Sequence, residues 1–299
     1  MSRAPAYAPH RLFVAPARAY PQLWRLGVGL FLATFAYLAL NQIFFRVIYG
    51  LTAGANSRLV EDLRSGATPV AMYILLFSFV FMSVGAGLSA RVMHHRSFAS
   101  LLGPLNLLWQ QFRAVSFAMI AVMAAVFLLP PYDMGGDYVP NMPLGQWLVL
   151  LLPSLFFVLV QVSAEEIVFR GYVQQQLAAR FRSPLVWMIL PSVLFALGHY
   201  LPDAAGENAL TIALWACTFG VLMADLTARA GTLGPAIAVH FWNNVSAILI
   251  VSLPDELSGL ALYLSPFSMD DTEALQAWLP VDFAMMFVLW LAARVTIRR

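Results

Sequence analysis

The stretch WLVLLLPSLFFVLVQVSAEEIVFRG, residues 147–171, joins a long apolar run to three charged residues. Residues 147–161 carry no charge and have the composition of a segment that lies in lipid. Glu165, Glu166 and Arg170 follow almost at once. A charge near the bilayer centre costs roughly 2.5–3.5 kcal/mol on insertion scales, so such residues face the interior of a helix bundle and mark functional sites. The stretch therefore predicts a membrane helix that carries a polar site.

The composition of the whole chain also indicates an integral membrane protein. Of its 299 residues, 61% are hydrophobic and 11% are charged, and the mean hydropathy is +0.76. Soluble domains carry roughly 25% charged residues. All 17 basic residues are arginines, which indicates a compositional bias of the genome, and they are scattered singly. The net charge of +2 therefore predicts no nucleic-acid partner, and the single Cys217 allows no internal disulfide.

Eight apolar stretches have the length of candidate membrane helices. They lie near residues 27–45, 70–92, 113–130, 146–179, 184–200, 208–227, 233–252 and 280–297. Together they predict an all-α polytopic membrane protein of about eight transmembrane helices. Residues 1–26 are expected to form a cytoplasmic N-terminal tail, and residues 27–130 to hold accessory helices 1–3.

The distribution of arginine orients the predicted helices. The loops 131–145, 201–207 and 253–279 contain no arginine, whereas the tail and the loops that alternate with these three contain most of the arginines. Cytoplasmic loops are enriched in arginine and lysine, so both termini are expected in the cytoplasm, in a bacterial cytoplasmic membrane. The loop between the first two helices, with Arg46, Arg58 and Arg64, departs from this pattern. The loop 253–279 has room for a short surface helix.

The spacing of the three charges separates the two glutamates. Glu166 and Arg170 are four residues apart, so they can pair on one helix face. Glu165 points about 100° away from that face. A partly buried carboxylate of this kind can act as a general base toward water, and we expect Glu165 to have that role.

Two histidines and an asparagine are the next polar residues in predicted membrane helices. His199 ends the fifth helix, and His240 and Asn244 share one face of the seventh. Peptide hydrolysis needs an activated water and donors for the oxyanion, and these side chains can supply both. Neither Ser163 nor Cys217 has an obvious histidine partner in sequence. The remaining histidines lie among arginines, and we expect them to be solvated and replaceable: His10, His94 and His95.

Three short motifs in this half of the chain resemble those of one protease family. EEIVFR at 165–170 matches EExxxR, FALGH at 195–199 matches FxxxH, and HFWNN at 240–244 matches HxxxN. In this order they resemble the CPBP family of CAAX prenyl endopeptidases and bacterial Abi proteins, also described as intramembrane metalloproteases. The resemblance covers about residues 145–252, the predicted helices 4–7, and leaves residues 280–299 as a final helix and cytoplasmic C-terminus.

The resemblance implies a glutamate-type intramembrane endopeptidase with a CAAX-protease-like helical core and a cavity open to the cytoplasm. Glu165 would activate water, His199 would assist it, and His240 and Asn244 would hold the oxyanion. Glu166 and Arg170 would support the site, with no metal or other cofactor. The implied substrate is a membrane-embedded or lipid-modified peptide, in peptide processing or bacteriocin immunity, and the lipid bilayer is the other partner.

Other interpretations of the same residues remain open. Two histidines and a glutamate also suit a catalytic zinc ion, although no HExxH motif is present. A non-catalytic transporter or binding scaffold is a further alternative, but its ionisable groups would be spread over more helices than they are here. Phe195 and Trp242 could line a groove for a lipid chain, and ordinary helix packing is the competing explanation for both.

Overall fold

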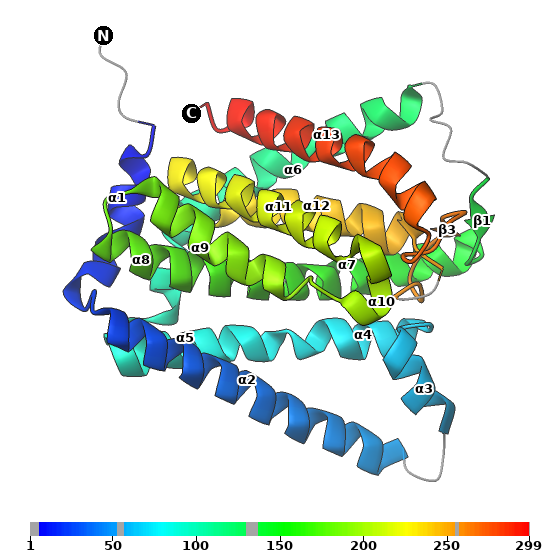
Figure 1. The fold of residues 1–299 in the computed structure, drawn as a ribbon, viewed down its shortest axis with the longest axis horizontal. Helices are drawn as coiled ribbons and strands as arrows, with labels where there is room; N and C mark the ends of the chain where they lie inside the picture. Colours follow the sequence, from blue (N-terminus) through cyan, green and yellow to red (C-terminus); the bar gives the residue numbers. More distant parts are fainter. Residues whose placement is uncertain (1–5, 53–56, 130–136, 255–256, 299) are drawn as a thin grey trace.

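The computed structural model describes residues 6–52, 57–129, 137–254 and 257–298, and α-helices dominate its fold (Figure 1). The helices are α1 (Ala8–Val14), α2 (Leu23–Thr52), α3 (Ser57–Ser65), α4 (Pro69–Ser78), α5 (Val80–His94), α6 (Leu105–Leu128), α7 (Leu144–Glu166), α8 (Gln175–Arg180), α9 (Pro184–Leu197), α10 (Pro202–Ala205), α11 (Ala209–Ala230), α12 (Gly234–Asn244) and α13 (Thr272–Thr296). Two π-helical segments, Ile167–Gln174 and Val245–Ile250, directly follow α7 and α12.

All eight predicted stretches are largely helical, and the described residues contain six continuous helical segments that are long and apolar enough to cross a membrane. The six are Leu23–Thr52, Pro69–His94, Leu105–Leu128, Leu144–Arg180, Pro202–Ala230 and Thr272–Thr296. The fifth predicted stretch forms only the shorter helix Pro184–Leu197. The seventh forms α12 and its π segment. The chain is an all-α polytopic membrane protein.

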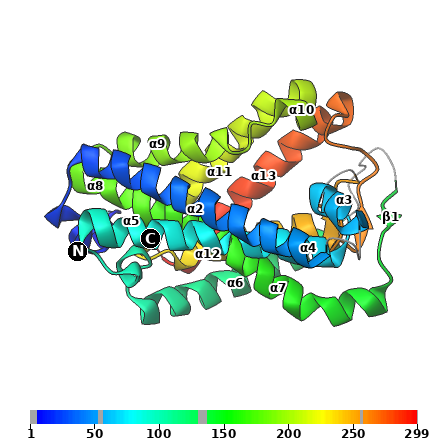
Figure 2. The same cartoon turned by 90° about the horizontal axis from the view of Figure 1, so that it is seen from below.

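The helices run roughly along the long axis of the molecule, and most of the turns between them lie at its two ends (Figures 1 and 2). One end holds α1, α8 and the last turn of α13; the opposite end holds α3, α10 and the strands. Both ends of the described chain therefore lie at the same end of the bundle. The turn between α8 and α9, with Arg180 and Arg182, lies there too.

The loop 253–279 differs from expectation. In place of a surface helix, its described part contributes the strand β3 (Tyr263–Leu264) to a small sheet of order β1-β3-β2, and α13 already begins at Thr272. β1 (Val139–Pro140) pairs antiparallel with β3, and β2 (Val251–Ser252) pairs parallel with it. Residues 1–5 of the expected tail, 130–136 and 255–256 lie outside the described residues.

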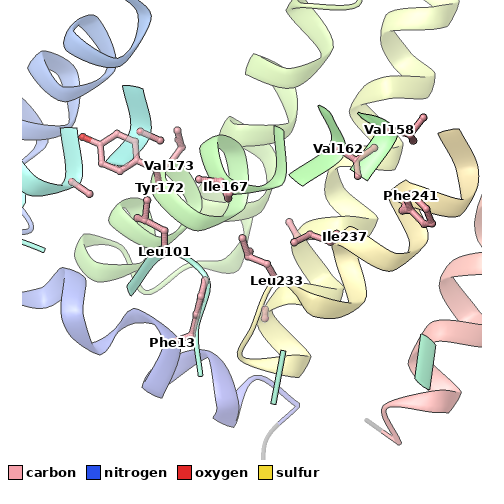
Figure 3. Close-up of a cluster of buried hydrophobic side chains, with 14 of the residues drawn as sticks. Phe13, Leu101, Val158, Val162, Ile167, Tyr172, Val173, Leu233, Ile237 and Phe241 are labelled. Carbon is pink, nitrogen blue, oxygen red and sulfur yellow. The ribbon is translucent and has the colours of Figure 1, made fainter. Parts of the chain in front are cut away.

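The largest buried apolar cluster joins the N-terminal helix to the predicted core (Figure 3). Phe13 of α1 and Leu101 pack with the side chains of α7, its π segment and α12. Val158, Val162, Ile167, Tyr172, Ile237 and Phe241 are among them. The helix that carries Glu165 and the helix that carries His240 are thus held against each other by a continuous core.

Two histidines expected to be solvated are buried instead. His10 of α1 is 5% exposed, and its ring lies 4.4 Å from that of Trp187. His94 is 1% exposed; its Nε2 lies 3.0 Å from the Tyr172 hydroxyl and its Nδ1 3.2 Å from the Tyr20 carbonyl oxygen. His95 is exposed as expected. The expectation for His10 and His94 was wrong because α1 and the end of α5 pack onto the core.

Candidate active site

Glu166 and Arg170 form a buried ion pair at the end of α7. Arg170 Nη1 donates to Glu166 Oε1 at 2.9 Å, and Nη2 donates to the Gly220 carbonyl oxygen on α11 at 3.2 Å. The two side chains are at most 1% exposed. The i, i+4 pairing predicted from sequence is present, and the guanidinium also connects α7 to α11.

The helix widens into a π segment immediately after Glu166. Hydrogen bonds over Ile167–Gln174 span five residues instead of four. The second π segment begins immediately after Asn244. π-Helical turns occur frequently at functional sites, and here each one follows directly on polar residues of the predicted site.

His240 lies between the two glutamates. Its Nδ1 is 2.8 Å from Glu166 Oε1, and its Nε2 is 3.4 Å from Glu165 Oε2. Because Glu166 already accepts from Arg170, the His240 Nδ1–H is the donor in the first contact. Nε2 and Glu165 are then placed to share one proton. With that proton, two carboxylates, one guanidinium and one imidazole form a buried set with no net charge.

Gln161 completes the connection between Glu165 and Asn244. Its Nε2 donates to Glu165 Oε2 at 2.8 Å, and its Oε1 accepts from Asn244 Nδ2 at 2.9 Å. Glu165 is therefore hydrogen-bonded. Its direction about 100° away from the Glu166–Arg170 face did not predict these partners. Sequence reasoning missed Gln161, although it stands four residues before Glu165 at the end of an apolar run.

His199 approaches the same carboxylate from the end of α9. Its Nδ1 lies 2.9 Å from the carbonyl oxygen of Phe195, and the ring lies within electrostatic range of Glu165. A carbonyl oxygen only accepts, so Nδ1 carries the hydrogen and Nε2 of the neutral ring is free to accept a proton. His199 is half-buried, whereas His240 is 4% exposed. Tyr37 of α2 also lies within electrostatic range of Glu165 and was not anticipated.

The two aromatic residues predicted to contact substrate have different surroundings. Phe195 is buried, with its ring 4.4 Å from His199, 6.1 Å from His240 and 5.0 Å from the guanidinium of Arg170. It forms part of the wall behind the polar site. Trp242 is half-buried, lies 5.3 Å from the Phe241 ring and packs against the core clusters. A role for either residue in binding substrate stays a prediction.

The zinc interpretation requires three converging ligands. Across the described ranges, no three histidine, cysteine, aspartate or glutamate side chains are arranged as a metal site. Both nitrogens of His240 face carboxylates. The geometry instead suits proton transfer: a buried carboxylate, a histidine in contact with it and a second histidine with a free Nε2.

Comparison with known proteins shows what this core is similar to. No solved structure matches the chain significantly. A protein of Bacillus subtilis (strain 168), uncharacterized protein YyaK, is 24% identical over 262 residues, which cover 83% of this chain and 84% of the relative. Residues 145–246 match the family model for Rce1-like, type II CAAX prenyl endopeptidases. Residues 145–246 of this chain are thus similar to the Rce1-like CAAX prenyl endopeptidases, which are a protease family.

Proposed function

We propose that the chain is an intramembrane endopeptidase in which Glu165 activates the hydrolytic water. The observation that carries the proposal is the surroundings of Glu165. Glu165 is 8% exposed, and its carboxylate accepts from Gln161 and lies 3.4 Å from His240 Nε2. A glutamate buried in an apolar helix with these partners suits a general base better than a structural anchor.

Glu165 and His199 would act on the water together. Glu165 takes one proton as the water oxygen bonds to the carbonyl carbon of the scissile peptide bond. The free Nε2 of His199 accepts a hydrogen bond from the same water and orients its lone pair. The tetrahedral intermediate collapses with cleavage of the carbon–nitrogen bond, and the proton held by Glu165 passes to the leaving amine.

His240 and Asn244 would stabilise the oxyanion. Asn244 Nδ2 has two hydrogens, and Gln161 uses one of them. The second hydrogen can face the oxyanion. His240 Nε2–H can turn from Glu165 toward the same oxygen once Glu165 has taken the proton from water. Glu166 and Arg170 would position His240, because Glu166 Oε1 holds its Nδ1–H.

The substrate would be a peptide segment that reaches the site within the membrane. The residues of the site lie on helices of the predicted membrane core or, for His199, in the turn directly after one of them, so a membrane-associated or lipid-modified peptide is the class we propose. Processing of such peptides, including a part in bacteriocin immunity, would be the biological role. We further propose a bacterial cytoplasmic membrane with both termini in the cytoplasm.

Cleavage of a quenched lipopeptide library by the purified protein tests the activity. The variant Glu165→Gln should lose cleavage by at least about a hundredfold with unchanged yield, because the amide cannot take the proton. Glu207→Gln, which changes an exposed glutamate, is the matched control and should retain activity. Equal turnover by Glu165→Gln would remove the proposed role, and a library left intact by the wild type would favour a transporter or scaffold. Activity lost to a chelator and restored by zinc would instead support the zinc mechanism.

A further inference from the structure

A second feature lies at the end of the bundle that holds α1, apart from the polar site. A cavity of about 670 Å³ opens between α1 with the following 3-10 turn, Ala15–Ala19, and the α8–α9 turn. Small-molecule sites commonly measure about 300–1,000 Å³. None of the residues proposed for hydrolysis lines this cavity. It is therefore a separate candidate binding site.

The lining of the cavity is strongly basic. Four arginines contribute to it, two from each wall, and all four are exposed: Arg11, Arg18, Arg180 and Arg182. Among the described residues, no aspartate or glutamate lines it. Within the described part of the chain, none of the four takes part in an ion pair with a carboxylate. Four unneutralised guanidinium groups around one opening repel each other and attract an anion.

The interior of the cavity is aromatic and partly polar. Trp187 and His10 line it and are buried, and Tyr7 lines it half-exposed. Burial, together with the nearby Arg18, lowers the pKa of His10 to about 4. At neutral pH His10 is thus uncharged, and the positive charge belongs to the arginines at the opening. The cavity offers guanidinium forks outside and neutral aromatic groups inside.

We propose that this cavity binds a phosphate-bearing anion. Guanidinium groups bind phosphate oxygens through paired charge-assisted hydrogen bonds, and several arginines from two helices can converge on one phosphate. Basic pockets at the cytoplasmic ends of membrane helices suit phospholipid head groups. A soluble phosphate ester presents the same group, so the experiment has to separate these two sources.

Two exposed leucines favour the phospholipid as the source. Leu12 is 80% exposed beside Arg11, and Leu185 is 67% exposed near Arg182. Along the chain, Leu12 directly follows Arg11 and Leu185 directly follows Pro184, and both of these neighbours line the cavity. An interfacial site that contacts both a head group and the upper part of an acyl chain has this combination.

Ligand binding by the full-length protein in neutral detergent tests the proposal. Native mass spectrometry would measure retained phosphatidylglycerol against phosphatidylcholine, and calorimetry would measure inorganic phosphate. The cavity variant is Arg180→Gln with Arg182→Gln. The control is Arg91→Gln with Arg113→Gln, which removes two exposed arginines elsewhere. Ala179→Trp fills the cavity and leaves its charge unchanged.

We expect the wild type to prefer phosphatidylglycerol, and the cavity variant to lose about tenfold more affinity than the control variant. Ala179→Trp should weaken binding without a change of charge, which keeps the test decisive if the double variant folds poorly. Binding of inorganic phosphate with the same sensitivity, and no lipid preference, would identify a soluble phosphate as the source. Equal effects of the cavity and control variants, or unchanged binding in Ala179→Trp, would overturn the proposal.

Discussion

At the scale of single residues, Gln161 is the side chain that holds the candidate base in place. It donates to Glu165 and accepts from Asn244, so one amide spans α7 and α12. Because the contacts are specific to an amide, a residue of similar size without hydrogen-bonding groups would release both partners. A displacement of about 1 Å at a catalytic group can cost a hundredfold in rate.

Gln161→Leu is therefore expected to lower the rate of peptide cleavage by about a hundredfold, with the folded yield little changed. The control is Gln146→Leu, since Gln146 is an exposed glutamine on the same helix. Turnover of the lipopeptide library by each variant measures the effect. Cleavage by Gln161→Leu at the wild-type rate would show that this amide does not position Glu165.

His10 gives the protein a pH-dependent stability. Burial lowers the pKa of His10 to about 4 from an ordinary value of 6.5. Between pH 4 and pH 6.5, His10 therefore binds a proton in the unfolded chain but not in the folded chain. The contribution of His10 to the free energy of unfolding is then fully present above pH 6.5. It is lost as the pH drops toward 4, by roughly 3 kcal/mol in total.

Thermal unfolding of the wild type in detergent at pH 7 and pH 4.5 measures this loss. His10→Gln should unfold at a temperature that depends less on pH over the same range, and His95→Gln, which changes an exposed histidine, should behave like the wild type. An identical pH dependence in His10→Gln and the wild type would contradict the assignment.

At this scale the sequence predicted some contacts and not others. The four-residue spacing of Glu166 and Arg170 was enough to predict their pairing, because both lie on one helix. The position of His240 between the two glutamates depends on how α12 packs against α7, and no local spacing encodes it. His94 beside Tyr172 was missed for the same reason: the contact joins residues far apart in the chain.

At the scale of helices, Gly220 allows α11 to approach α9 closely. A Cβ at this position would lie 2.8 Å from the Ser192 Cβ, which is too close for an unshifted helix pair. The Gly220 carbonyl oxygen also accepts from Arg170. The packing of α9 on α11 and the placement of Arg170 are thus linked at one residue.

Gly220→Ala is expected to push the two helices apart, with a loss of about 1–3 kcal/mol of stability and a fall in cleavage rate. Gly27→Ala is the control, because a Cβ at Gly27 meets nothing within 4 Å. Thermal unfolding and the cleavage assay measure both effects. A Gly220→Ala protein as stable and as active as Gly27→Ala would mean that the helices adjust without cost.

The membrane helices themselves were largely predictable from the sequence, whereas the π segments within them and the early end of α9 were not. The length of the apolar runs was enough to predict all eight helical stretches. In lipid, a chain segment must satisfy its backbone hydrogen bonds internally, so a long apolar run folds as a helix. The π segments lie within sequences that read as ordinary apolar helix, such as VSAILI at 245–250. The short α9 was predicted to be longer, since FALGHY continues the apolar pattern to residue 200 while the helix ends at Leu197.

At the scale of the whole molecule, the alternation of arginine-rich and arginine-free turns makes a prediction about topology. Arg182 lies at the end of the bundle with α1, and Asp203 lies in α10 at the opposite end; both are exposed. With the termini in the cytoplasm, only the α10 end faces outward.

Labelling of intact cells with a membrane-impermeant maleimide tests this topology in a Cys217→Ala background, which removes the single native thiol. Asp203→Cys should react in intact cells, and Arg182→Cys should react only after the cells are opened. Reaction of Arg182→Cys from outside would invert the proposed orientation and would place the arginine-lined cavity on the outer face.

The π segments after Glu166 and Asn244 have a consequence for the history of the chain. A π turn arises when one residue is inserted into an α-helix. The backbone hydrogen bonds then span one more residue, and the helix widens locally. Homologues that lack such an insertion would align with single-residue gaps within 167–174 or 245–250. In homologues without the first insertion, α8, which continues the helix beyond residue 174, would be rotated relative to the face of α7 that carries Glu165 and Glu166.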